Sequence, residues 1–359
     1  MTKEQRVSRL VSSLGDSVTG PADILADQKP SALFRPIVTL MRGFLRCNPD
    51  RRTSKIGRAL RRLIHPAFML LVPAFMDYRQ VIESKSALRG EAADERLNLT
   101  DEPVIWCVNH GFKDDIAASI HATRQSYVYF GSLPHFCNSL DGLALFVNGV
   151  ILCNRKVRRA KQASYAQAVC SLQQGNDLTI WPEGVWNKTP DKLVLPLWPG
   201  IYRMARESGS KVVPVIHYLA DPHKKYEGNV IHTVIAEPIS MEGLSEQEGL
   251  EAIRDAMATW YFLLMERYGR TTREELMDGF ASADDAWDSA MAEHTGCVAY
   301  YDREIELCAD YRPKQIDRPE DVWQSVAEIE HIHAGNAAHV GYAGELVARE
   351  RRRDFQRRF

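Results

Sequence analysis

This sequence of 359 residues lacks several features, and each absence argues against a class of protein. Its seven cysteines form no Cys-x-x-Cys pair, and several lie in apolar stretches, so we interpret them as core residues in a reducing compartment. No apolar run reaches the roughly 18 residues of a membrane-spanning helix, and residues 1–16 contain no apolar segment typical of a signal peptide. The net charge is only −2, which argues against a general nucleic-acid binder.

The sequence does contain one segment with a strong charge asymmetry, residues 31–80. It has ten arginines and lysines but only two aspartates, interleaved with apolar runs that are too short to span a membrane. We interpret it as a pair of helices that lies on an anionic membrane surface, where each basic residue contributes about 1 kcal/mol. The alternative is two ordinary helices that pack on the rest of the protein with their arginines in solvent.

From residue 101 onward, apolar runs alternate with helical patterns, which predicts an α/β fold with a mostly parallel sheet flanked by helices. The predicted strands are Val104–Val108, Tyr127–Gly131, Gly149–Cys153, Asp177–Trp181, Lys211–Tyr218 and Val230–Glu237, with helices up to about 124, from 157 to 172 and from 199 to 209. We divide the chain into an N-terminal segment (1–80), a central domain (81–240) and a helical C-terminal extension (241–359). Apolar residues at helical spacing between Leu250 and Leu264 indicate the first helix of that extension.

The sequence Asn-His-Gly-Phe-Lys-Asp-Asp at residues 109–115 joins the first of these strands to a helix. The carboxyl edge of a parallel sheet is where α/β enzymes present reactive side chains. If His110 precedes the helix and Asp115 lies in its first turn, the carboxylate reaches one ring nitrogen and leaves the other free to accept a proton. The pair is a candidate general base with an orienting carboxylate, although an aspartate at a helix start is also an ordinary cap.

Three further stretches with candidate functional residues fall at strand ends or within strands of the same domain. The strand from Gly149 delivers Arg155 to its end, and the strand that ends at Trp181 leads to Glu183 on a Pro/Gly turn. The third is Val-Pro-Val-Ile at residues 213–216, whose proline a central strand seldom tolerates. Each is weak alone, because an arginine can form a surface ion pair and Pro-Glu-Gly is a common turn.

Together, in this order and spacing, the four stretches resemble the glycerolphosphate and lysophosphatidic acid acyltransferase family over about residues 101–238. The blocks of that family are His-x4-Asp, Gly-x-x-x-x-[Asn/Asp]-Arg, Phe-Pro-Glu-Gly-Thr-Arg-Ser and Val-Pro-Val. This sequence has Asn-His-Gly-Phe-Lys-Asp-Asp, Gly-Val-Ile-Leu-Cys-Asn-Arg, Trp-Pro-Glu-Gly-Val-Trp-Asn and Val-Pro-Val-Ile. The resemblance implies that the central domain is a catalytic domain with a glycerolphosphate acyltransferase-like fold.

The resemblance also implies a reaction, the transfer of a fatty acyl group to a hydroxyl of a lysophosphatidic acid-like glycerolipid. The acyl donor is acyl-CoA or acyl carrier protein, and no bound cofactor is implied. In this interpretation His110 is the base, and Asp115 orients it. The implied substrate-binding residues are Asn109, Arg155, Glu183, Gly184, Lys188 and Pro214. Because a long-chain substrate stays in the bilayer, we expect a peripheral protein at the cytoplasmic face of a membrane.

The third block departs from the family pattern, because Val185-Trp186-Asn187 replaces Thr-Arg-Ser. The arginine that usually contacts the acceptor phosphate is missing, and Lys188 or Lys113 can replace its charge but not its bidentate geometry. The acceptor therefore stays open between lysophosphatidic acid, a lysophospholipid with a larger headgroup and another membrane-linked alcohol or amine. A catalytically silent lipid-binding protein of the same fold is the alternative from another class.

A metal-dependent hydrolase is the other enzyme class that the sequence allows. The candidate ligands are His110, Asp114 and Asp115 in the first block and His331, His333 and His339 in a C-terminal cluster. Metal sites need three or four converging ligands, and none is evident near the first block. His331 and His333 also point apart if they lie on a helix. The sequence therefore predicts no metal site.

Overall fold

The computed structural model describes the central part of the chain. The described residues are 78–85, 102–112, 114–131, 148–153, 158–184, 186–187, 193–219 and 230–268, with short pieces between 31 and 76 and the positions 88, 142 and 145. Most of the basic N-terminal segment, Arg155, Lys188 and everything after Tyr268 lie outside the described residues. The predictions for those parts stay predictions. Within the described part, no helix combines the length and the apolar character needed to cross a bilayer.

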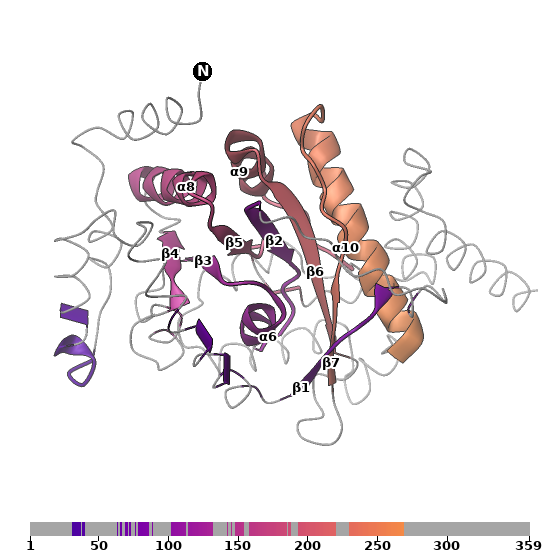
Figure 1. Ribbon diagram of the computed structural model, residues 1–359, viewed down its shortest axis with the longest axis horizontal. Helices are drawn as coiled ribbons and strands as arrows, with labels where there is room; N and C mark the ends of the chain where they lie inside the picture. Colours follow the sequence, from indigo (N-terminus) through magenta and orange to yellow (C-terminus); the bar gives the residue numbers. More distant parts are fainter. Residues whose placement is uncertain are drawn as a thin grey trace, which may run out of the picture.

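A sheet of seven strands forms the centre of the described part (Figure 1). The strands are β1 (Arg79–Ile82), β2 (Val104–Val108), β3 (Ser126–Gly131), β4 (Val150–Cys153), β5 (Asp177–Ile180), β6 (Lys211–Leu219) and β7 (Val230–Ile235). Their order in the sheet is β1-β7-β6-β2-β5-β3-β4, and every pair is parallel except β6 with β7. The predicted α/β class with a mostly parallel sheet is confirmed.

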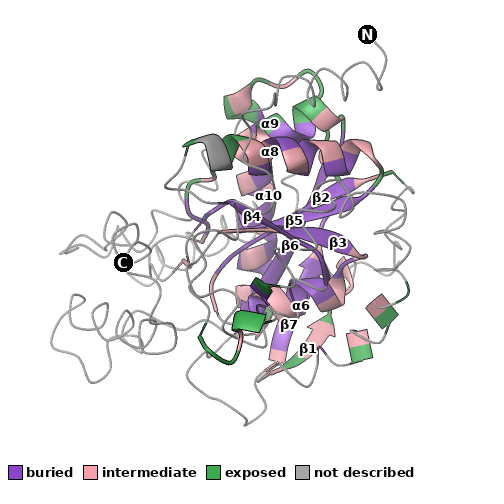
Figure 2. Cartoon of the chain, turned by 90° about the vertical axis from the view of Figure 1, so that its left-hand side faces the viewer, coloured by how far each residue is buried: buried purple, intermediate pink, exposed green. Residues whose placement is uncertain are grey.

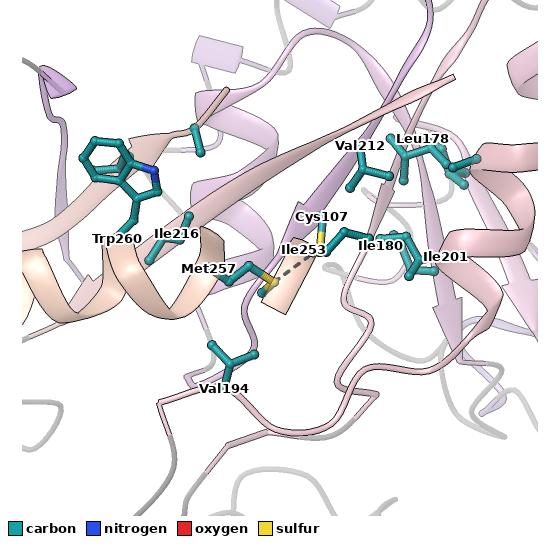
Figure 3. Close-up of a cluster of buried hydrophobic side chains, with 14 of the residues drawn as sticks. Cys107, Leu178, Ile180, Val194, Ile201, Val212, Ile216, Ile253, Met257 and Trp260 are labelled. Carbon is teal, nitrogen blue, oxygen red and sulfur yellow. Dashed lines mark hydrogen bonds between the residues drawn. The ribbon is translucent and has the colours of Figure 1, made fainter. Parts of the chain in front are cut away.

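Helices cover both faces of the sheet, and alternate residues of β2 divide between the two faces. The helices are α6 (Asp115–Ala122), α8 (Arg158–Gln173), α9 (Gly200–Ser208) and α10 (Glu246–Tyr268). Ile105 and Cys107 belong to the hydrophobic cluster that α8, α9 and α10 complete, shown in part in Figure 3, whereas Trp106 belongs to the cluster that includes Ile120 of α6. Burial on both faces explains why this strand is a continuous apolar run. Figure 2 shows the central strands as the buried layer.

Two elements extend the folded unit beyond the predicted domain boundaries at 80/81 and 240/241. Strand β1 pairs in parallel with β7 at the edge of the sheet, in a stretch whose sequence pattern predicted no strand. Helix α10 packs on β6, and its apolar stripe at Ile253, Met257, Trp260 and Leu264 is buried in the main cluster. The sheet with its covering helices therefore runs from residue 79 to residue 268, across both boundaries.

Pro214 lies within the central strand β6, and the segment that follows β7 explains how the sheet accommodates this proline. The carbonyl of Pro214 accepts a hydrogen bond from the N–H of Ala236 (2.8 Å), so its missing N–H faces the end of β7. Val212 and Ile239 exchange two hydrogen bonds of 2.9 and 2.7 Å. Between the pairs Val215–Ile235 and Val212–Ile239, the segment after β7 has one residue more than β6, which makes a β-bulge. A bulge is a place where a sheet tolerates proline.

Candidate active site

The turn between β2 and α6 brings His110 and Asp115 into contact. The imidazole Nδ1 of His110 lies 2.8 Å from Oδ2 of Asp115, the first residue of α6. The Asp115 side chain is fully buried, and about a tenth of the His110 side chain is exposed. The expected contact between carboxylate and imidazole at this edge of the sheet is therefore present in the structure.

Asp115 orients the histidine rather than capping its helix. Its Oδ2 also accepts hydrogen bonds from the backbone N–H groups of Gly111 (3.0 Å) and Phe112 (3.4 Å), which precede α6. Because this oxygen accepts from donors on every side, the proton shared with His110 belongs on Nδ1. The other ring nitrogen, Nε2, then carries a lone pair, which is the form that a general base requires.

The third block packs directly on His110. The rings of Trp181 and Trp186 each lie 5.8 Å from the imidazole, the first tilted by 45° and the second edge-on. The backbone N–H of Asn187 donates to the carbonyl of His110 (2.6 Å). The indole N–H of Trp181 is buried and has no hydrogen-bond partner among the described residues. An unsatisfied buried donor beside a reactive side chain is expected where a ligand completes the site.

Glu183 braces the loop that carries His110. Its Oε1 accepts from the backbone N–H of His110 (2.9 Å) and its Oε2 from that of Leu195 (2.8 Å), and the residue is almost fully buried. Burial raises the pKa of Glu183 to about 7, against the opposing effect of these two hydrogen bonds and of His110. The turn from Trp181 ends at Gly184, which has a φ of 77° that favours glycine.

Two other predicted substrate-binding residues lie inside the fold. Asn109 is buried, and its side chain exchanges two hydrogen bonds with the backbone of His217: its Nδ2 donates to the carbonyl (2.9 Å), and its Oδ1 accepts from the N–H (2.7 Å). Pro214 is buried in β6 opposite Cys107. These contacts, like those of Glu183, hold the protein together and give no support to a role in substrate binding.

Three buried polar residues that belong to none of the four sequence blocks lie next to the dyad, namely His217, Ser119 and Thr233. The Nε2 of His217 lies 2.8 Å from Oγ of Ser119, and its Nδ1 lies 2.9 Å from Oγ1 of Thr233. The signal that points to them is a histidine inside an otherwise apolar strand, Val-Val-Pro-Val-Ile-His-Tyr-Leu. A polar side chain on such a strand needs buried partners.

No group of three histidine, cysteine, aspartate or glutamate residues within the described part could hold a metal ion. The C-terminal histidines at 331, 333 and 339 lie outside the described residues. Around the dyad, the hydrogen bonds of Asp115 and Glu183 described above go to protein groups. The described site is thus a histidine held by a carboxylate, with two indole rings near its imidazole, at the carboxyl edge of a parallel sheet.

These features define an α/β protein with a buried His–Asp pair, and part of the chain is similar to known proteins. Residues 90–218, about a third of the chain, match the family model described as "Acyltransferase". The match includes all four blocks on which the sequence resemblance was based.

Two curated relatives are similar to parts of this chain. A 1-acyl-sn-glycerol-3-phosphate acyltransferase of Chlamydomonas reinhardtii is 26% identical over 121 residues, which cover 34% of this chain and 36% of that protein. An enzyme of the same name from Borreliella burgdorferi is 33% identical over 76 residues, or 21% of this chain and 30% of the relative. The matches thus span about a third of the length of either relative.

Among solved structures, the crystal structure of the 1-acyl-sn-glycerophosphate acyltransferase PlsC from Thermotoga maritima is similar to this chain. The two share 18% sequence identity with a TM-score of 0.43, over 64% of this chain and 89% of the other.

Proposed function

We propose that this protein transfers a fatty acyl group from acyl-CoA or acyl carrier protein to a hydroxyl of a lysophosphatidic acid-like glycerolipid. The observation that carries the proposal is the contact between His110 Nδ1 and Asp115 Oδ2, which leaves Nε2 able to accept a proton. The match of residues 90–218 to the acyltransferase family model and the names of the two curated relatives support the reaction class.

In the proposed reaction, Nε2 of His110 removes the proton of the acceptor hydroxyl while its oxygen attacks the thioester carbonyl. The tetrahedral intermediate collapses, the carbon–sulfur bond breaks, and the leaving thiolate takes the proton back from His110. Asp115 stabilises the imidazolium that forms between these steps. A positioned base contributes about 10²–10⁴ in rate, and binding the two substrates in the right orientation supplies much of the rest. The step needs neither a covalent enzyme intermediate nor a bound cofactor.

The contacts of the third block bear on the acceptor. Trp186 stands where the family usually has an arginine, and its ring lies edge-on to His110. An apolar ring beside the base gives no charge for an acceptor phosphate, so we propose that Arg155 and Lys188 supply it. We propose as the acceptor a lysolipid with a phosphate or phosphodiester headgroup, and a lysophospholipid larger than lysophosphatidic acid or another membrane-linked alcohol or amine is the alternative.

The test is to incubate the purified protein with labelled acyl-CoA or acyl carrier protein and a panel of lysolipids, and to identify acylated products by mass spectrometry. We expect an acylated lysolipid that is absent with His110→Ala and unaffected by EDTA. The matched control is His232→Gln on β7, a histidine whose side chain contacts Glu83 and Tyr268 rather than the dyad. Binding of lysolipids without any product would favour a catalytically silent lipid-binding protein. Loss of product with EDTA would favour metal chemistry.

We propose further that the protein is peripheral and lies at the cytoplasmic face of a membrane through residues 31–76. Within that segment Leu33, Leu63 and Leu70 are each about four-fifths exposed, so their apolar side chains are available to a lipid phase. Together with the nine basic residues between 31 and 76, they fit an anionic lipid surface. Cosedimentation with phosphatidylglycerol vesicles should exceed that with phosphatidylcholine vesicles and fall in high salt. Equal cosedimentation with both would contradict the proposal.

A further inference from the structure

A chain of hydrogen bonds, all buried except the partly buried first one, runs from the edge strand β1 to the first turn of α6. Gln80 Nε2 lies 2.8 Å from Thr233 Oγ1, which lies 2.9 Å from His217 Nδ1. His217 Nε2 lies 2.8 Å from Ser119 Oγ, and Ser119 Oγ lies 2.5 Å from the carbonyl oxygen of Asp115. Four elements, β1, β7, β6 and α6, are thus joined by a single polar path that ends at the residue holding His110.

Only one arrangement of protons satisfies this path from end to end. A carbonyl oxygen can only accept, so the Ser119 hydroxyl donates to Asp115 and accepts from His217 Nε2–H. His217 Nδ1 then accepts from the Thr233 hydroxyl, which accepts in turn from the amide of Gln80. The ring of His217 is neutral in this arrangement, and burial lowers its pKa to about 4. Every polar atom of the His217 ring is therefore used.

The backbone of His217 is also committed, and its partner is the residue next to His110. The N–H of His217 donates to Oδ1 of Asn109 (2.7 Å), and its carbonyl accepts from Nδ2 of Asn109 (2.9 Å). One residue of β6 thus contacts the strand end that carries His110 through its backbone. Through its ring and Ser119 it contacts the helix turn that carries Asp115.

We propose that His217 is a positioning residue for acyl transfer, which holds the strand end that carries His110 and the helix turn that carries Asp115 in register. The inference rests on the proposed function for its kinetic readout. A base that is misplaced by about 1 Å can lose about 10²-fold in rate, so even a small shift of α6 matters. His217 lies in the fold behind the pair, where it contacts Asn109, Ser119 and Thr233.

The chain offers variants that separate positioning from bulk packing. His217→Gln places an amide N–H near the position of Nε2 and can still donate to Ser119, whereas His217→Leu removes both ring contacts. Ser119→Ala removes the link to Asp115 at the cost of one oxygen atom. The matched control is His232→Gln on the neighbouring strand β7, because His232 contacts Glu83 (2.7 Å) and stacks on Tyr268, away from the dyad.

We expect Ser119→Ala to lower kcat by about tenfold and His217→Leu by about 10²-fold, with the KM values of both substrates changed less than about threefold. His217→Gln should restore most of the kcat that His217→Leu loses, and His232→Gln should match wild type. A packing defect alone would affect His217→Gln and His217→Leu alike. If His217→Leu does not fold, Ser119→Ala and His217→Gln still decide the question.

A second readout does not depend on activity. The proton that His110 Nδ1 shares with Asp115 should give a low-field proton NMR resonance that is absent in Asp115→Asn. We expect Ser119→Ala to shift or broaden that resonance, and His232→Gln to leave it unchanged. Wild-type kcat together with an unchanged resonance in Ser119→Ala would overturn the inference. If the resonance responds to Ser119→Ala but wild type transfers no acyl group, the positioning stands and the proposed function fails.

Discussion

Glu183 and His217, two buried groups beside the dyad, are expected to give protein stability opposite dependences on pH. Burial raises the pKa of Glu183 from 4.5 to about 7 and lowers that of His217 from 6.5 to about 4. Folded Glu183 therefore binds its proton more tightly than in the unfolded chain, and folded His217 binds its proton less tightly. Because stability follows the difference in bound protons, the two groups act in opposite directions.

The magnitudes follow from these pKa values. For Glu183, the free energy of unfolding falls as pH rises from about 4.5 to about 7. For His217, the free energy of unfolding falls as pH drops from about 6.5 to about 4. At about 1.4 kcal/mol per pH unit, each group contributes a change of about 3 kcal/mol. In the wild-type protein the two changes largely offset each other, so neither is visible there.

Glu183→Gln and His217→Gln separate the two contributions, because glutamine does not titrate. The assay is urea denaturation of wild type and both variants at several pH values from 4 to about 7.5. Relative to wild type, the free energy of unfolding of Glu183→Gln should rise by about 3 kcal/mol over this range, and that of His217→Gln should fall by about as much. Glu183→Gln should also show a constant loss, since a glutamine has one acceptor oxygen for two N–H donors.

The test compares how the free energy of unfolding changes with pH in the three proteins, not its absolute value at any one pH. Three parallel profiles, within about 1 kcal/mol of one another after a constant offset, would refute the assignment of Glu183 and His217 as buried titrating groups. Slopes of the opposite sign would refute it as well.

Three further results are expected. Met257→Ala should lower the free energy of unfolding by about 2–5 kcal/mol in urea denaturation, because α10 packs on the sheet there, whereas the exposed Glu251→Ala should change little. Trp181→Phe keeps an aromatic ring but removes the unsatisfied N–H, so steady-state kinetics should show kcat/KM reduced about tenfold at unchanged thermal stability. An unchanged kcat/KM would show that this N–H does not take part in the reaction. Arg155→Ala should raise the KM for the lysolipid far more than that for the acyl donor, and equal increases would contradict its assignment to the acceptor.

Local patterns predicted most of the fold. The helix expected at residues 157–172 is α8 at Arg158–Gln173, and the apolar spacing from Leu250 to Leu264 is the buried stripe of α10. Strand β1 was missed because it has only four residues and no face that is consistently buried. This strand forms because it pairs with β7, about 150 positions later in the sequence, and no local sequence pattern predicts that pairing.

The predicted part of the site depends on contacts between residues close in sequence, whereas the part that was not predicted depends on contacts between distant residues. His110 and Asp115 lie five positions apart across one turn, so their contact follows from a strand, a turn and a helix in succession. His217 meets Ser119 and Asn109, which lie 98 and 108 positions earlier. Those contacts depend on β6 lying beside β2, and the sequence gives the strands but not their order.

The most direct test of the central claim is the rate at which His110→Ala releases thiol from acyl-CoA when a lysolipid acceptor is added. If His110 removes the acceptor proton with Asp115 as its orienting partner, the rate should fall by about 10²–10⁴-fold while the protein stays folded. A rate for His110→Ala within about tenfold of wild type would contradict the claim that this histidine is the base.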